Sequence, residues 1–169
     1  MNSENFKTKN ILFVCLGNIC RSPAAEAVLK YKISDMFPYN KEYYIDSAGI
    51  GPWHEGQLPD RRMRRHGAQR EYDISSIARQ IKPSDFDRFD YIFAMDNENV
   101  KALTRLARND EDRKKIYCTA DFMTRHPEYD TVPDPYYGGD RDFELALDLI
   151  EDACDGIIKW LSEQNKGKI

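Results

Sequence analysis

The sequence lacks the features that would assign it to several specialised classes of protein. It has only four cysteines in 169 residues, without paired spacing, so we expect no disulfide framework. No stretch approaches the roughly 18 apolar residues that a membrane span needs, and residues 1–8 are too polar for a secretory signal. The histidines His54, His66 and His126 have no metal-ligand spacing. We therefore expect a cytoplasmic protein that uses neither a metal nor another cofactor and binds no membrane.

A strong charge of either sign is also absent. The 25 basic and 29 acidic side chains leave a net charge of −4, which argues against a nucleic-acid partner. Internal repeats, low-complexity segments and linkers are missing too, and the length suits one domain with one core. We predict a single domain, residues 1–169, that acts as a monomer. Within it, residues 1–8 form a polar N-terminal extension and residues 162–169 a polar C-terminal end.

Short apolar runs alternate with helix-like patterns along the chain. We expect strands at residues 11–14, 43–46, 91–95 and 116–118. We expect helices at residues 24–36, 59–66, 98–107 and 142–161. This alternation predicts an α/β fold with a parallel sheet and helices on both of its faces. Ligands of such folds bind beyond the carboxyl ends of the strands, and Cys15 stands at that end of the first predicted strand.

Residues 10–29 form the most informative segment of the chain. A short buried strand leads to a loop that contains Cys15 and Arg21, and Ser22 then begins a helix as its candidate cap. A loop that leaves a buried strand and enters a helix directs its free N–H groups at one point, where the helix dipole favours negative charge. The segment therefore predicts an anion-binding site.

The residue types in this loop suit an attack on phosphorus. Amide donors, a helix N-terminus and a guanidinium all favour the thiolate form of Cys15, and the Ser22 hydroxyl is a further donor to it. The planar fork of Arg21 can bind two oxygens of a phosphate, and Gly17 lets the backbone approach a ligand closely. We expect Cys15 to be a nucleophile that forms a covalent intermediate.

The loop, with the sequence CLGNICRS at residues 15–22, resembles the active-site loop of the low-molecular-weight protein tyrosine phosphatases. Residues 46–49 (DSAG), 94–96 (AMD) and 132–139 (VPDPYYGG) resemble further segments of that family, in the same order. The resemblance implies a three-layer αβα fold with a four-stranded, parallel, twisted sheet and a phosphate-binding loop after the first strand. It also implies hydrolysis of phosphotyrosine in proteins through a phosphocysteine intermediate, with phosphate or another oxyanion bound in the site.

The same resemblance implies roles for residues outside the loop. Asp134, held between two prolines, corresponds to the general acid that protonates the leaving tyrosine. Asn18 and Ser47 correspond to the residues that hold the shape of the phosphate loop. Asp96, after the third predicted strand, is a further candidate for ordering the site. The other residues that we expect to bind phosphate or line the cleft are Leu16, Gly17, Ile19, Cys20, Trp53, Tyr136 and Tyr137.

Two features of the sequence, Cys20 and a run of arginines, are each open to two interpretations. Cys20 either traps an oxidised Cys15 as a reversible disulfide or is a packed thiol in the first helical turn. The basic run of Arg61, Arg62, Arg64 and Arg65 is either a solvated helix face, which we favour, or a dock for acidic flanks of a phosphoprotein.

Two other functions compete with the phosphatase. An arsenate reductase of the same fold relays electrons through additional cysteines, but residues 61–117 contain none and Asp134 would be idle. A phosphate-binding module without turnover would have no use for a thiol or an acid loop.

Overall fold

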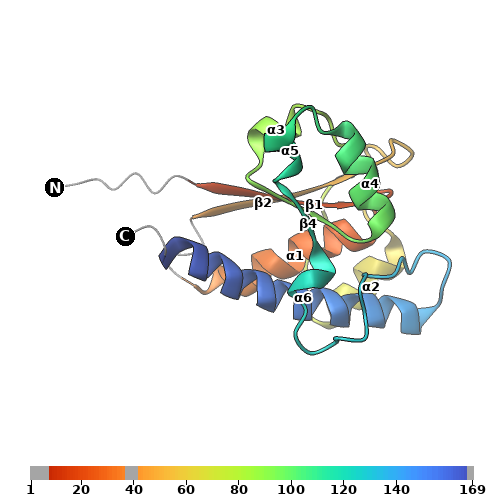
Figure 1. The fold of residues 1–169 in the computed structure, drawn as a ribbon. Helices are drawn as coiled ribbons and strands as arrows, with labels where there is room; N and C mark the ends of the chain where they lie inside the picture. Colours follow the sequence, from red (N-terminus) through yellow and green to blue (C-terminus); the bar gives the residue numbers. More distant parts are fainter. Residues whose placement is uncertain (1–7, 37–41, 167–169) are drawn as a thin grey trace.

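A computed structural model describes residues 8–36 and 42–166 (Figure 1), so most of the predicted N-terminal extension and residues 167–169 lie outside it. Four parallel strands form one sheet in the order β2-β1-β3-β4. The strands are β1 (Lys9–Cys15), β2 (Tyr43–Gly49), β3 (Tyr91–Ala94) and β4 (Ile116–Cys118). Each overlaps a run predicted from the sequence, and the expected α/β fold with a four-stranded parallel sheet is confirmed.

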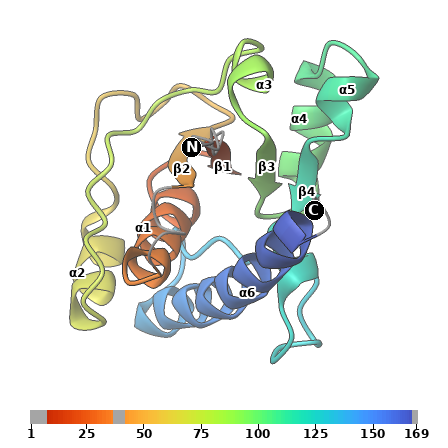
Figure 2. The ribbon, with the colours of Figure 1, turned by 90° about the vertical axis from the view of Figure 1, so that its left-hand side faces the viewer.

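Helices cover both faces of this sheet (Figures 1 and 2). One face carries α1 (Arg21–Ser34), α2 (Arg61–Gln69) and α6 (Asp140–Lys166), and the other carries α3 (Asp85–Arg88), α4 (Asn97–Leu106) and α5 (Asp110–Arg113). A short 3₁₀ helix, η2 (Thr119–Phe122), follows β4 and packs on α6. No helix within the described ranges is long and apolar enough to cross a membrane.

The central strand β1 explains this layering. Ile11 and Phe13 belong to the core cluster that contains α1 and α6, whereas Leu12 and Val14 belong to the cluster with α3 and α4. All four side chains are fully buried because successive residues of a strand point to opposite faces of the sheet. The carboxyl end of β1 therefore brings Cys15 to the edge of the sheet between the two helical layers.

Helix α2 continues past His66, where the sequence predicted its end, to Gln69.

Glu71, just beyond the C-terminus of α2, has a φ of 69°, in the left-handed region that favours glycine. We expect Glu71→Gly to raise the free energy of unfolding by about 0.5–1 kcal/mol, because glycine relieves this strain at some cost in chain entropy. Chemical denaturation measures the gain. Glu71→Ala, which keeps the strain, should show none, and an equal gain in both variants would exclude the backbone explanation.

Candidate active site

The loop between β1 and α1 surrounds the sulfur of Cys15 with hydrogen-bond donors. The Ser22 hydroxyl lies 3.0 Å from Cys15 Sγ, and both side chains are buried. Within the part of the chain that the structure describes, the backbone amides of residues 16–20 donate no hydrogen bond, which leaves them for a bound anion. Helix α1 begins directly after the loop, at Arg21, so its N-terminal dipole also favours negative charge here.

The expectation that Ser22 caps α1 is wrong. The helix begins one residue earlier, at Arg21, and its N-cap residue, Cys20, makes no side-chain capping hydrogen bond. Ser22 therefore lies in the first turn, where its hydroxyl faces the sulfur of Cys15 instead of the helix amides. Only the second of the two predicted roles of Ser22, that of a donor to the thiolate, is compatible with this geometry.

Asn18 fixes the shape of the loop from beneath. Its φ of 57° is one that asparagine adopts more readily than most residues, and its side chain is buried. The amide nitrogen donates to Ser22 Oγ at 2.8 Å and to Ser47 Oγ at 3.0 Å, and its oxygen accepts from the backbone of Arg79 at 3.0 Å. Ser47 in turn donates to Glu26 Oε1 at 2.7 Å. Asn18 and Ser47 thus lie behind the cleft and connect the loop to β2.

Arg21 is the largest fully buried side chain among the described residues. Its Nη1 donates to Asp96 Oδ2 at 2.6 Å and to the Val132 carbonyl at 3.0 Å, while Nη2 lies 3.5 Å from Asp134 Oδ2. Its Nε has no hydrogen-bond partner among the described residues, so Nε and Nη2 form a fork that can bind two phosphoryl oxygens. Burial alone would lower the pKa of Arg21, but the Cys15 sulfur and the two carboxylates raise it.

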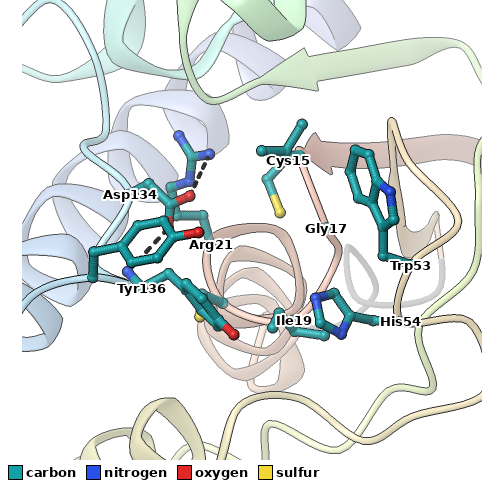
Figure 3. A pocket seen from close by; sticks show the side chains of 11 residues that line it. Cys15, Gly17, Ile19, Arg21, Trp53, His54, Asp134 and Tyr136 are labelled. Carbon is teal, nitrogen blue, oxygen red and sulfur yellow. Dashed lines mark hydrogen bonds and ion pairs between the residues drawn. The ribbon is translucent and has the colours of Figure 1, made fainter.

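Residues 133–139 form the segment that we call the acid loop. Its Asp134 side chain is partly exposed beside the fork of Arg21 and accepts a hydrogen bond from the Tyr136 amide at 3.1 Å (Figure 3). A second turn within the loop is closed by the Gly138 amide, which donates to the Pro135 carbonyl at 2.9 Å. These local bonds direct the carboxylate back toward the cleft.

The cleft itself has a volume of about 330 Å³. Figure 3 shows Trp53 and Tyr136 on opposite sides of the Cys15 sulfur. The other residues around the cleft are Leu16, Gly17, Ile19, Cys20, Arg21, His54, Asp134 and Tyr137. Every residue that the sequence predicted for the site therefore lines this cleft, apart from Asn18, Ser22 and Ser47, which lie behind the loop, and Asp96, which contacts Arg21.

His54 is the cleft residue that sequence reasoning missed. Its Nδ1 lies 3.1 Å from Gln57 Oε1, and its ring is 6.5 Å from that of Tyr136, so it borders the mouth of the cleft. The only available signal was its position next to Trp53, because its spacing to the other histidines carries no information.

Cys20 is buried at the base of the cleft. Burial, together with the negative charge of Asp60, raises the pKa of its thiol.

Comparison with known proteins identifies relatives over nearly the whole chain. A family model described as low molecular weight phosphotyrosine protein phosphatase matches residues 10–167. A putative low molecular weight protein-tyrosine-phosphatase of Synechocystis is 40% identical over 154 residues, which cover 91% of this chain and 97% of the relative. The corresponding Streptomyces coelicolor protein is 39% identical over 162 residues, 95% and 98% of the two chains.

A solved structure agrees with the sequence relatives. The crystal structure of a protein tyrosine phosphatase from Entamoeba histolytica, with Hepes in the active site, matches with a TM-score of 0.89 at 47% identity. The match covers 94% of this chain and 99% of that one.

Proposed function

The chain belongs to the low molecular weight phosphotyrosine protein phosphatase family and is a hydrolase of phosphotyrosine, and from this premise we propose which of its residues carry out the reaction. The observation that carries the proposal is the meeting, around one cleft, of Cys15 and Arg21 from the loop between β1 and α1 with Asp134 from the acid loop. Neither an arsenate reductase nor a phosphate-binding module without turnover is favoured by the relatives.

In the first step, the Cys15 thiolate attacks the phosphorus of phosphotyrosine. A sulfur–phosphorus bond forms, the bond from phosphorus to the phenolic oxygen breaks, and Asp134 gives its proton to that oxygen. Arg21 and the amides of the phosphate loop bind the phosphoryl oxygens, on which negative charge is held during the transfer. The 3.0 Å contact between Ser22 Oγ and Cys15 Sγ supports a role for Ser22 in stabilising the thiolate.

In the second step, water hydrolyses the phosphocysteine. The carboxylate of Asp134 takes a proton from the attacking water, a new phosphorus–oxygen bond forms, and the sulfur–phosphorus bond breaks. The products are inorganic phosphate and the Cys15 thiolate, with Asp134 protonated again for the next cycle. Its partly exposed side chain supports this second role, because water can reach it.

The walls of the cleft support a preference for phosphotyrosine. We propose that a phenyl ring fits between Trp53 and Tyr136 and brings its phosphate to Cys15, and that the shorter side chain of phosphoserine does not reach the sulfur. Leu16 and Tyr137 complete these walls at the mouth, where 46% of Leu16 and 95% of Tyr137 is exposed. We propose phosphotyrosine-containing proteins as substrates because such exposed apolar side chains can contact the residues that flank the phosphotyrosine.

We also propose that the enzyme acts as a single-domain monomer in the cytoplasm and needs no metal. All residues of the proposed chemistry lie in one domain with one sheet, so the reaction needs no residue from a second copy of the chain. The four cysteines are free thiols, which suits a reducing compartment. Arg21 and the loop amides supply the positive charge that a metal would otherwise provide.

The role of Asp134 is tested by its removal. We expect Asp134→Ala to lower kcat/KM for phenyl phosphate by about 10²–10³-fold, because a phenoxide that leaves unprotonated is a poor leaving group. The loss should be far smaller for 4-nitrophenyl phosphate, whose leaving group needs no proton. Steady-state hydrolysis of both esters provides the measurement. The matched control is Asp130→Ala, an exposed aspartate just before the acid loop, which should leave both values unchanged. Equal losses for the two esters would remove Asp134 from the proposed mechanism.

A further inference from the structure

We propose that Arg62 is a positioning residue that holds the acid loop, and with it Asp134, in place above the phosphate loop. The inference rests on the proposed role of Asp134 as general acid. In the sequence, Arg62 is one of four arginines in a run for which a solvated helix face was the favoured interpretation. In the structure, it contacts the acid loop, α6 and Asp60, the residue that caps α2.

Arg62 holds the backbone of the acid loop directly. Its Nη2 donates to the Tyr136 carbonyl at 2.9 Å, and its Nη1 lies 3.5 Å from the Gly138 carbonyl. Its guanidinium carbon also lies 5.6 Å from the centre of the Tyr136 ring and 4.6 Å from that of Phe143 on α6. One side chain thus contacts the loop two and four residues after Asp134, together with the helix that follows.

Asp60 fixes Arg62 from the other side. Its Oδ1 accepts from Arg62 Nε at 3.1 Å and its Oδ2 from Nη2 at 3.0 Å, and Oδ1 also caps α2 through the Arg62 amide at 2.8 Å. Burial opposes the charge of Asp60, but the hydrogen bonds from Arg62 lower the pKa of the carboxyl below its usual value. The pair therefore stays ionised at neutral pH, in a two-point geometry that a lysine could not reproduce.

The same Asp60 connects this pair to the phosphate loop. Its backbone amide donates to the Ile19 carbonyl at 2.7 Å. A continuous path of hydrogen bonds therefore runs from the phosphate loop through Asp60 and Arg62 to the carbonyl of Tyr136. Because its two ends are the parts that bind the phosphoryl group and carry the acid, this path sets their relative position.

The other attachments of the acid loop lie at its two ends. Before it, the Val132 amide donates to the Met95 carbonyl at 2.9 Å, and at its last residue the Gly139 amide donates to Asp142 Oδ2 at 2.8 Å. Among the described residues, the other hydrogen bonds and ion pairs of the middle of the loop are its internal turns and the 3.5 Å contact between Arg21 and Asp134, and the Tyr136 ring lies 6.5 Å from that of His54. A bound phosphoryl group competes for Arg21, so during catalysis the hydrogen bonds from Arg62 are the ones that still connect the middle of the loop to α2.

The test compares leaving groups in Arg62→Ala. A general acid that is displaced by about 1 Å loses much of its effect, so we expect kcat/KM for phenyl phosphate to fall about tenfold. The value for 4-nitrophenyl phosphate should change by less than about twofold, since that step depends little on the acid. The ratio kcat/KM reports formation of the phosphocysteine, which is the step in which Asp134 gives its proton to the leaving oxygen. A merely structural role would lower both values by the same factor, and that result would overturn the proposal.

A double variant tests whether Arg62 acts through Asp134. If it does, Arg62→Ala should cause no further loss in kcat/KM when it is added to Asp134→Ala. Multiplicative losses in the double variant would overturn the inference and leave the role of Asp134 intact. A wrong assignment of Asp134 would show in a different way. In that case Asp134→Ala by itself would lower kcat/KM for both esters by the same factor.

Two further variants separate geometry from charge. Arg62→Lys keeps the charge but not the fork, so we expect it to lose nearly as much as Arg62→Ala, and full activity would overturn the proposal. Arg65→Ala removes the same charge from α2, together with an exposed ion pair to Asp140, and should leave the ratio of the two substrates unchanged. A similar shift of that ratio in Arg65→Ala would assign the effect to the charge of the helix instead of Arg62.

Discussion

Replacing Cys15 by serine should abolish hydrolysis of aryl phosphates, with a loss of kcat of about 10⁵-fold or more. The substitution changes one atom, but the hydroxyl of serine stays protonated at neutral pH and is a far weaker nucleophile than a thiolate. Ser22, the nearest side-chain partner at 3.0 Å, is itself a hydroxyl. The remaining parts of the site cannot compensate, because they bind and stabilise the phosphoryl group without forming a bond to it.

The same variant should still bind phosphate. Arg21 and the loop amides are unchanged, and the removal of the thiolate takes away a negative charge that repels the ligand. Titration calorimetry with inorganic phosphate should therefore give an affinity equal to or higher than that of the unchanged protein. The control is Cys118→Ser, a half-buried cysteine on β4 away from the cleft, which should keep full activity. Turnover by Cys15→Ser above about 1% of the original rate would exclude Cys15 as the nucleophile.

Retained binding without turnover also makes Cys15→Ser a means of finding substrates. A phosphoprotein that enters the cleft of this variant is held by Arg21 and released intact. Recovery of phosphotyrosine proteins that inorganic phosphate displaces would identify the substrates that the sequence leaves open.

The parts of the fold that could be predicted from the sequence are those made by residues close together in the chain. The strand, loop and helix of residues 10–29 are contiguous, so apolar runs and helix formers were enough to locate the anion site. The last helix was also clear, because its apolar residues recur every three or four positions over many turns. By contrast, α3 and α5 have four residues each, too few to show any period.

Contacts between distant segments could not be predicted in the same way. The partner of Arg21, Asp96, lies 75 positions away, and Arg62 reaches a carbonyl 74 positions away. The arginines of residues 61–65 cannot be distinguished in the sequence, because they are the same residue type in one short run. The three-dimensional arrangement separates them, with Arg62 turned to the acid loop and Arg65 exposed beside Asp140. His54 was missed for the same reason, since only the fold brings it to the cleft.

Gly156, in the interior of α6, shows how the same limit can reverse the sign of a prediction. By helix propensity alone, Gly156→Ala should stabilise the protein by up to about 1 kcal/mol. In the structure, an added Cβ would lie 1.8 Å from the carbonyl oxygen of Phe122 and 2.8 Å from its carbonyl carbon, because η2 packs directly on the helix at this point. Both atoms belong to the backbone, so no side-chain rotation can relieve the clash.

We therefore expect Gly156→Ala to destabilise the protein by about 3 kcal/mol, with a melting temperature about 6–12 °C lower. Gly67→Ala is the matched control, because Gly67 is also a glycine within a helix. There the added Cβ would meet the far end of the Ile74 side chain at 2.4 Å, which can move aside. Its change in melting temperature should stay within about 3 °C. Thermal unfolding followed by circular dichroism separates the two, and a Gly156→Ala protein as stable as the original would mean that η2 does not press on α6. Since η2 anchors the chain between β4 and the acid loop, the loss of this contact should also lower activity before the protein unfolds.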